Sequence, residues 1–127
     1  MKTLHKNTFA LLLLFSLFAT LPVFTVCASG IQEQEVKSIP TGSYVGNYIR
    51  NSENYTAIIQ IEAGEIRSIR LKYNDSPLTD AWAEQQADLV REANSTRVKT
   101  VPSPSGRNKS VLKAIELALQ AGLKMAE

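Results

Sequence analysis

The stretch YTAIIQIEAGEIRSIRL, from Tyr55 to Leu71, decides the fold. Its first half alternates between apolar residues and mostly polar ones, and the apolar members are Tyr55, Ala57, Ile59 and Ile61. A period of two is typical of a strand with one buried face. Ala63 and Gly64 follow as a turn signal, and Ile66, Ile69 and Leu71 supply a second strand. The stretch therefore predicts an antiparallel hairpin.

The segments on either side extend this hairpin into a small α+β domain. Upstream, PTGSYVGNYI (residues 40–49) sets Tyr44 and Tyr48 among glycines and predicts a further short strand. Downstream, residues 80–94 have a helical apolar face, which comprises Trp82, Gln86, Leu89 and Ala93, with Ala83 and Val90 beside it. The last helix has a broad apolar stripe that includes Val111, Ile115, Ala118 and Met125. We expect a small antiparallel sheet packed against about two helices.

Residues 1–28 have the pattern of a secretory signal peptide. Lys2 and Lys6 precede an apolar run over residues 9–15, and Val26 and Ala28 occupy the positions that a signal peptidase reads. Cleavage after Ala28 predicts an exported protein in the periplasm, in the cell envelope or secreted. Lipidation at Cys27 and an uncleaved anchor are the alternatives, and they are the only routes that the sequence offers to a membrane.

Residues 29–39 are polar, lack a sustained apolar period and precede Pro40, so they predict a linker. The remaining residues, 40–127, are expected to form one domain. A chain of about 100 residues buries roughly 60–70% of its unfolded surface, so it folds without a disulfide.

Composition excludes several classes of function. The only histidine, His5, and the only cysteine, Cys27, belong to the signal or its edge, so the exported chain has neither Ser-His-Asp nor Cys-His catalysis and no His- or Cys-based zinc site. Without Lys2 and Lys6 the fourteen basic residues become twelve, which equals the number of acidic ones. This balance predicts no nucleic-acid partner. We assign no catalytic and no metal-binding residues.

The loop before the last helix is the candidate site. A helix begins with backbone N–H groups that lack intrahelical partners, and its macrodipole favours an anion there. Gly106 allows close approach to the backbone, hydroxyl groups come from two serines, and two basic side chains suit a phosphate. The predicted binding residues are Ser105, Gly106, Arg107, Asn108, Lys109 and Ser110. Ordinary helix capping with solvated basic side chains is the alternative interpretation of the same pattern.

Three motifs in order resemble the small FMN-binding domain of exported flavoproteins: TGSYVG (residues 41–46), the hairpin (residues 55–71) and SGRNKSVLKAIELAL (residues 105–119). In that family the last helix follows a Ser-Gly-Ala-Thr-x-Ser/Thr loop. Ser105, Gly106 and Ser110 match the family loop, whereas Arg107 replaces the Ala and Asn108 replaces the Thr that some members esterify to the flavin phosphate. Because Asn108 has no hydroxyl group, the resemblance implies noncovalent FMN.

The resemblance implies an electron-transfer module that holds FMN and acts with a redox partner protein in the cell envelope. Tyr44, Tyr55 or Trp82 would offer a flat surface to the flavin ring, although aromatic residues at strand and helix spacing more often belong to the core. The alternative is a nonflavin relative that binds a protein or another ligand outside the cytoplasm. A stand-alone enzyme ranks last, because no nucleophile has an identifiable base.

Overall fold

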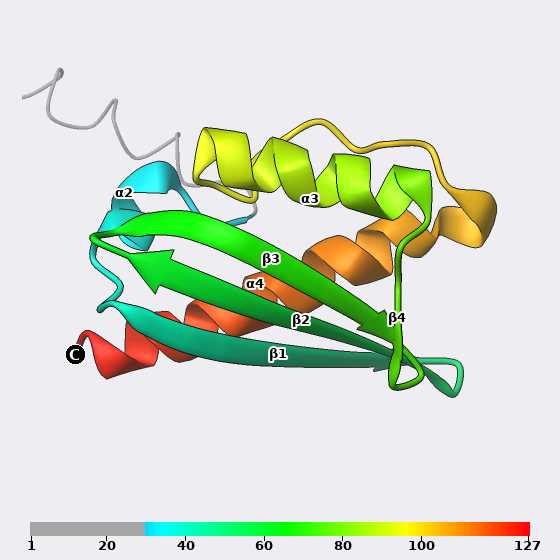
Figure 1. The fold of residues 1–127 in the computed structure, drawn as a ribbon, viewed down its shortest axis with the longest axis horizontal. Coiled ribbons are helices and arrows are strands. Elements are labelled where there is room, and N and C mark those ends of the chain that lie inside the picture. Colours follow the sequence, from blue (N-terminus) through cyan, green and yellow to red (C-terminus); the bar gives the residue numbers. More distant parts are fainter. Residues whose placement is uncertain (1–29) are drawn as a thin grey trace, which may run out of the picture.

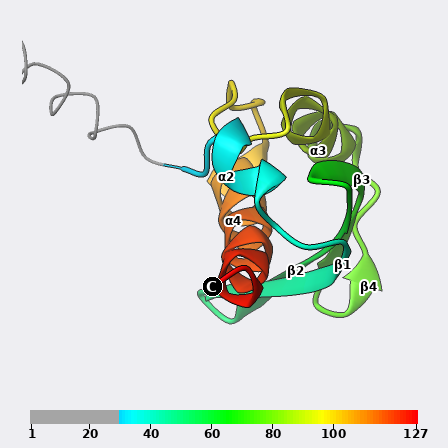
Figure 2. The same cartoon turned by 90° about the vertical axis from the view of Figure 1, so that its left-hand side faces the viewer.

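The computed structural model describes residues 30–127, so the predicted signal peptide and Cys27 lie outside it. The described chain forms a four-stranded antiparallel sheet in the order β1-β2-β3-β4, with helices that pack on one of its faces (Figures 1 and 2). Its elements are α2 (Glu33–Lys37), β1 (Gly42–Arg50), β2 (Glu53–Glu62), β3 (Glu65–Tyr73), β4 (Ser76–Pro77), α3 (Ala81–Ala93), the 3₁₀ turn η2 (Pro104–Gly106) and α4 (Arg107–Met125). The predicted α+β class is therefore confirmed.

The hairpin β2–β3 has the predicted turn and the predicted buried face. Tyr55, Ala57, Ile59 and Ile61 are all at most 1% exposed. Both turn residues have positive φ, 53° at Ala63 and 76° at Gly64, and the two-residue turns at 51–52 and 74–75 share this feature. Two positive φ angles match the twist of the flanking strands. The three turns therefore set the register of consecutive antiparallel strands.

Helix α4 crosses β1 so closely that position 46 requires glycine. A Cβ atom at Gly46 would collide with the carbonyl oxygen of Ala114 and the backbone nitrogen of Ala118. The predicted stripe of α4 is buried at Val111, Ile115 and Ala118, but Met125 in the last turn is 70% exposed. The close crossing brings the first turn of α4 to the end of the sheet where β2 begins.

The buried face of α3 is rotated slightly from the predicted one. Ala83, Gln86, Ala87 and Val90 are buried, whereas Trp82 and Leu89 are half-buried and Ala93 is exposed. Gln86 is fully buried, and both polar atoms of its side-chain amide are hydrogen-bonded. Nε2 donates to the carbonyl oxygen of Lys99, and Oε1 accepts from the N–H of Val101. The side chain of Gln86 thus holds the loop that leads toward α4.

The predicted linker is wrong for residues 31–39, which belong to the domain. Ile31, Val36 and Ile39 are buried in the core, at 4%, 0% and 2% exposure. The backbone N–H of Ile31 donates to Thr96 Oγ1, 2.7 Å away, and Ser95 Oγ donates to the carbonyl oxygen of Ile31 at 2.7 Å. Val36 belongs to a five-residue helix, whereas Ile31 and Ile39 lie on either side of it. The three buried residues therefore follow neither a helical nor a strand repeat in the sequence.

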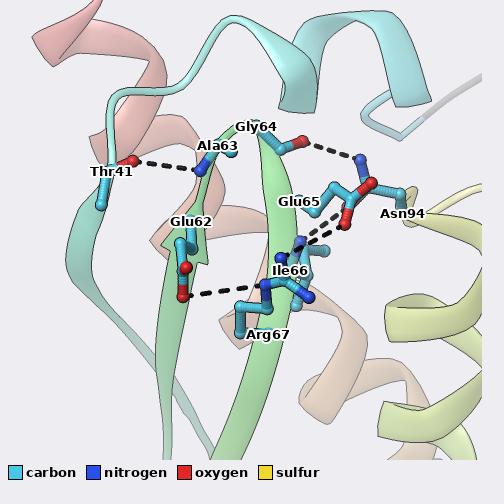
Figure 3. Close-up of polar contacts among 8 residues, drawn as sticks. All are labelled: Thr41, Glu62, Ala63, Gly64, Glu65, Ile66, Arg67 and Asn94. Carbon is cyan, nitrogen blue, oxygen red and sulfur yellow. Dashed lines mark hydrogen bonds and ion pairs between the residues drawn. The ribbon is translucent and has the colours of Figure 1, made fainter.

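Asn94 closes the end of the sheet at the β2–β3 turn (Figure 3). It ends α3 in the left-handed conformation, with φ 53°, which asparagine tolerates better than most residues. Its Nδ2 donates to the carbonyl oxygen of Gly64 at 3.0 Å, and its Oδ1 accepts from the N–H of Ile66 at 2.8 Å. This single neutral side chain ties α3 to the hairpin.

Candidate functional site

The chain before α4 folds into a compact turn that is capped from within. Ser105 and Gly106 both have positive φ, 53° and 67°, and α4 begins at Arg107. Ser103 Oγ accepts from the N–H of Asn108 at 2.8 Å and donates to Asn108 Oδ1 at 3.0 Å. Asn108 is only 6% exposed. The side chain of Asn108 therefore stabilises the turn and is not directed at a ligand.

Arg107 is the central side chain of this end of the sheet. Its Nε donates to Tyr55 Oη at 3.0 Å, and Tyr55 Oη in turn donates to Glu53 Oε2 at 2.7 Å. The guanidinium carbon lies 4.2 Å from the ring centroid of Tyr73 and 5.7 Å from that of Trp82. Cation–π contact of this kind orients a guanidinium group and stabilises it. Side chains of β2, β3 and α3 thus hold a cation that belongs to α4.

The pairing of β2 with β3 builds the aromatic part of this arrangement. Tyr55 and Tyr73 are Cα partners across the two strands, and their ring centroids are 5.2 Å apart at 55°. Trp82 adds its ring from the first turn of α3. The indole N–H of Trp82 is buried and has no hydrogen-bond partner in the described residues. The three rings, which we call the aromatic wall, all have their centroids within 4.2–5.8 Å of the guanidinium carbon of Arg107.

The surroundings of Tyr55 and Arg107 keep each of these two side chains in one charge state. Burial raises the pKa of the Tyr55 phenol above its ordinary value, and the hydrogen bond from Arg107 opposes this only in part. The hydrogen bond to Tyr55 also raises the pKa of Arg107. Tyr55 is therefore neutral and Arg107 is cationic at every physiological pH.

A hollow of about 240 Å³ lies beside Arg107, between the β1–β2 turn and the first turn of α4. We refer to it as the Arg107 hollow; it is lined by Arg50, Asn51, Glu53, Tyr55, Ser105, Arg107 and Ser110. Within residues 30–127 neither of its arginines forms an ion pair. Among the residues that the structure describes, Arg107 donates a hydrogen bond only through Nε, so its terminal amino groups are available to a ligand.

Three of the six residues predicted from the sequence meet at this hollow: Ser105, Arg107 and Ser110. Asn108 is hydrogen-bonded to Ser103, and Lys109 is exposed and does not line the hollow. Gly106 does not line the hollow, and a Cβ atom at this position would have no heavy atom within 4 Å. The structure adds three lining residues that the sequence did not single out as ligand contacts, namely Arg50, Asn51 and Glu53, and it also places Tyr55 there.

The aromatic wall uses two of the three aromatic residues suggested as a flavin surface, but in another role. Tyr55 and Trp82 contact Arg107, and the hydroxyl of Tyr44 donates to the carbonyl oxygen of Pro40. The partner of Tyr55, Tyr73, was not predicted. The sequence does indicate this pairing, because Tyr73 lies nearly as far after the β2–β3 turn as Tyr55 lies before it.

The chain matches no protein-family model, and neither the curated proteins nor the solved structures contain a significant match. The resemblance to exported FMN-binding domains therefore rests on the three motifs alone. Within residues 30–127, no helix combines the length and the apolar character needed to span a membrane.

Proposed function

We propose that this protein is an exported module that binds a phosphate-bearing ligand noncovalently, and that FMN is this ligand. The observation that carries the proposal is the Arg107 hollow, in which a cation is fixed by Tyr55 and Tyr73 while its terminal amino groups have no acceptor within the described part of the chain. A guanidinium group held in this way loses little side-chain entropy when it binds an oxyanion.

The residues of the hollow fit a phosphate group. The terminal amino groups of Arg107 suit two phosphate oxygens at once, and the Ser105 and Ser110 hydroxyls add hydrogen bonds from the same turn. The hollow also lies at the N-terminal end of a 19-residue helix, where the macrodipole contributes about 0.3–1 kcal/mol toward an exposed anion. Most of the phosphate affinity would therefore come from Arg107.

The hollow holds only the phosphate end of FMN. Its 240 Å³ is below the roughly 300–1,000 Å³ that pockets for drug-sized ligands occupy. The rings of Tyr73 and Trp82 already face Arg107, so the flavin ring system would lie outside the hollow, against the protein surface. Bound FMN supplies reversible electron transfer, and we propose that an envelope protein exchanges electrons with it there.

The first turn of α4 supports a noncovalent complex. Asn108 occupies the position of the acceptor threonine, and its amide is engaged by Ser103. The site would therefore exchange free FMN with solution.

A second candidate ligand is a small zwitterion such as an amino acid. Glu53 lines the same hollow as two arginines, and its carboxylate repels a phosphate but attracts an ammonium group. This nonflavin function would make the protein an extracytoplasmic ligand-binding module without a redox role.

A titration with three ligands separates these functions. We expect the purified protein to quench FMN fluorescence with saturable affinity, and to bind riboflavin at least tenfold more weakly because riboflavin lacks the phosphate. Glycine should not compete with FMN. Competition by glycine together with equal affinities for FMN and riboflavin would favour the zwitterion function, and neither quenching nor a thermal shift at millimolar FMN would contradict flavin binding.

A further inference from the structure

A second hollow lies on the opposite edge of the sheet from β1, between β3 and α3. It measures about 250 Å³. We call it the β3 groove; it is lined by Ile69, Arg70, Leu71, Pro77, Leu78, Thr79, Glu84 and Ala87. Leu71, Leu78 and Ala87 form an apolar floor, each with 6–8% of its surface exposed. Unlike the Arg107 hollow, the β3 groove is mainly apolar.

The backbone of β3 is open along this groove. Strand β4 pairs only with Lys72 and Tyr73, at the C-terminal end of β3 (Figure 1). The chain then adds one bond, from the N–H of Leu78 to the carbonyl oxygen of Leu71 at 2.9 Å, before it turns away to α3. At the other end of β3, the N–H of Ile66 is occupied by Asn94. The edge between these two points, residues 67–70, has no neighbouring strand in the described range 30–127.

Strand geometry directs the polar groups of Ile69 into this gap. Because the carbonyl oxygen of Leu71 points away from β2, the polar groups of Ile69, two residues earlier, point the same way in an antiparallel ladder. Ile69 lines the groove and is half-buried. A short extended segment beside β3 would therefore pair with the backbone of Ile69.

Charge on the outer face of β3 defines the chemistry of such a segment. Arg70 and Lys72 point away from the helices, opposite Ile58 and Thr56 of β2, and within residues 30–127 neither forms an ion pair. On the groove side, Glu84 disfavours an incoming carboxylate. Side chains of an added strand alternate between the two faces. The matching segment therefore alternates between acidic residues and large apolar ones.

We propose that the β3 groove binds an extended, acidic and apolar segment of a partner protein by strand addition. The apolar side chain enters the groove above Leu71 and Leu78, and a flanking carboxylate lies beside Arg70 on the open part of the edge. A second copy of this chain is a poor occupant, because the open residues 67–70 include two arginines and no acidic residue, so pairing β3 with itself brings like charges together. This proposal does not depend on FMN binding.

The test uses a fluorescein-labelled peptide, acetyl-Glu-Leu-Glu-Ile-Glu-Leu-Glu-amide, and fluorescence anisotropy with the full protein. We expect saturable binding that weakens at least tenfold in Arg70→Glu and by less than twofold in Lys124→Glu, a matched charge reversal in the last turn of α4. Both residues are exposed, so both variants should fold.

A second peptide, N-methylated at the central isoleucine, separates strand addition from simple charge attraction. N-methylation removes a backbone donor without changing a side chain, so strand addition predicts at least a tenfold loss of affinity. Equal binding of the two peptides, equal effects of the two charge reversals, or no saturable binding at millimolar protein would each overturn the proposal.

Discussion

The two ends of the β2–β3 hairpin are each tied to a helix by one polar side chain, but the two side chains differ in what they leave free. At the turn end, Asn94 uses both its donor and its acceptor on the backbone of the hairpin, at Gly64 and Ile66 (Figure 3). At the other end, Arg107 donates a hydrogen bond to the described chain only from Nε, to Tyr55. A fully satisfied neutral side chain stabilises a fold, whereas a partly satisfied cation is positioned and can still bind.

This contrast predicts that the Asn94 end governs stability and the Arg107 end governs binding. Substitutions at the two ends should therefore have separable effects, and the largest change in free energy is expected at Asn94.

Asn94→Ala should destabilise the protein by about 2–4 kcal/mol. The substitution leaves the carbonyl oxygen of Gly64 and the N–H of Ile66 without partners, and it places alanine in a left-handed conformation. Urea unfolding measures this loss. Asn94→Gly is the matched control, because glycine relieves the backbone strain but not the lost hydrogen bonds. Losses below about 0.5 kcal/mol in both variants would show that the hydrogen bonds of Asn94 do not stabilise the fold.

Arg107→Gln should weaken FMN binding at least tenfold, which corresponds to about 1.4 kcal/mol. Its stability should fall by about 1 kcal/mol or less, since the cation–π contacts and one hydrogen bond are lost at a partly exposed site. Lys109→Gln removes an equal charge two residues away, outside the hollow, and should change the affinity by less than twofold. Similar losses in the two variants would mean that only general charge attracts the ligand.

Tyr55→Phe should lower stability by about 1 kcal/mol at neutral pH, because Arg107 loses its acceptor and Glu53 its donor. It should also change the response to alkaline pH. The pKa of Tyr55 is raised in the folded state, so the native protein holds this proton more tightly than the unfolded chain does. The stability that this proton contributes is complete below the unfolded pKa of about 10 and is lost as the pH rises through the folded value.

Unfolding free energies at neutral and strongly alkaline pH measure this effect. The wild-type protein should lose more stability between the two conditions than Tyr55→Phe does. The remaining tyrosines are common to both proteins and cancel in the difference. An equal loss in the two proteins would show that Tyr55 does not titrate differently in the folded state.

Periodicity predicted the hairpin and the long C-terminal helix because both have one buried face with a regular repeat. The domain boundary was wrong, since Ile31, Val36 and Ile39 reach the core from a short helix and its extended flanks, which have no repeat. The loop at the start of α4 was predicted as a binding site, and Ser105, Arg107 and Ser110 do line a common hollow.

The contacts of Arg107 with the aromatic wall could not be predicted from the sequence, for a physical reason. It requires the exact strand register that pairs Tyr55 with Tyr73, and that register contains an irregularity between Gln60 and Ile61. It also requires α3 and α4 to approach each other so that Trp82 and Arg107 come into contact. Neither requirement is local, so no window of sequence contains it.

Both ends of the hairpin can be followed in one experiment, a titration of ¹⁵N-labelled protein with FMN observed by ¹H–¹⁵N NMR. Specific binding at the Arg107 hollow predicts saturable shifts of the amides of residues 105–110 and of Arg107 Nε. The side-chain amide of Asn94 and the backbone amide of Ile66 should not move. Shifts at the Asn94 end with none at residues 105–110, or no shifts at millimolar FMN, would contradict the account.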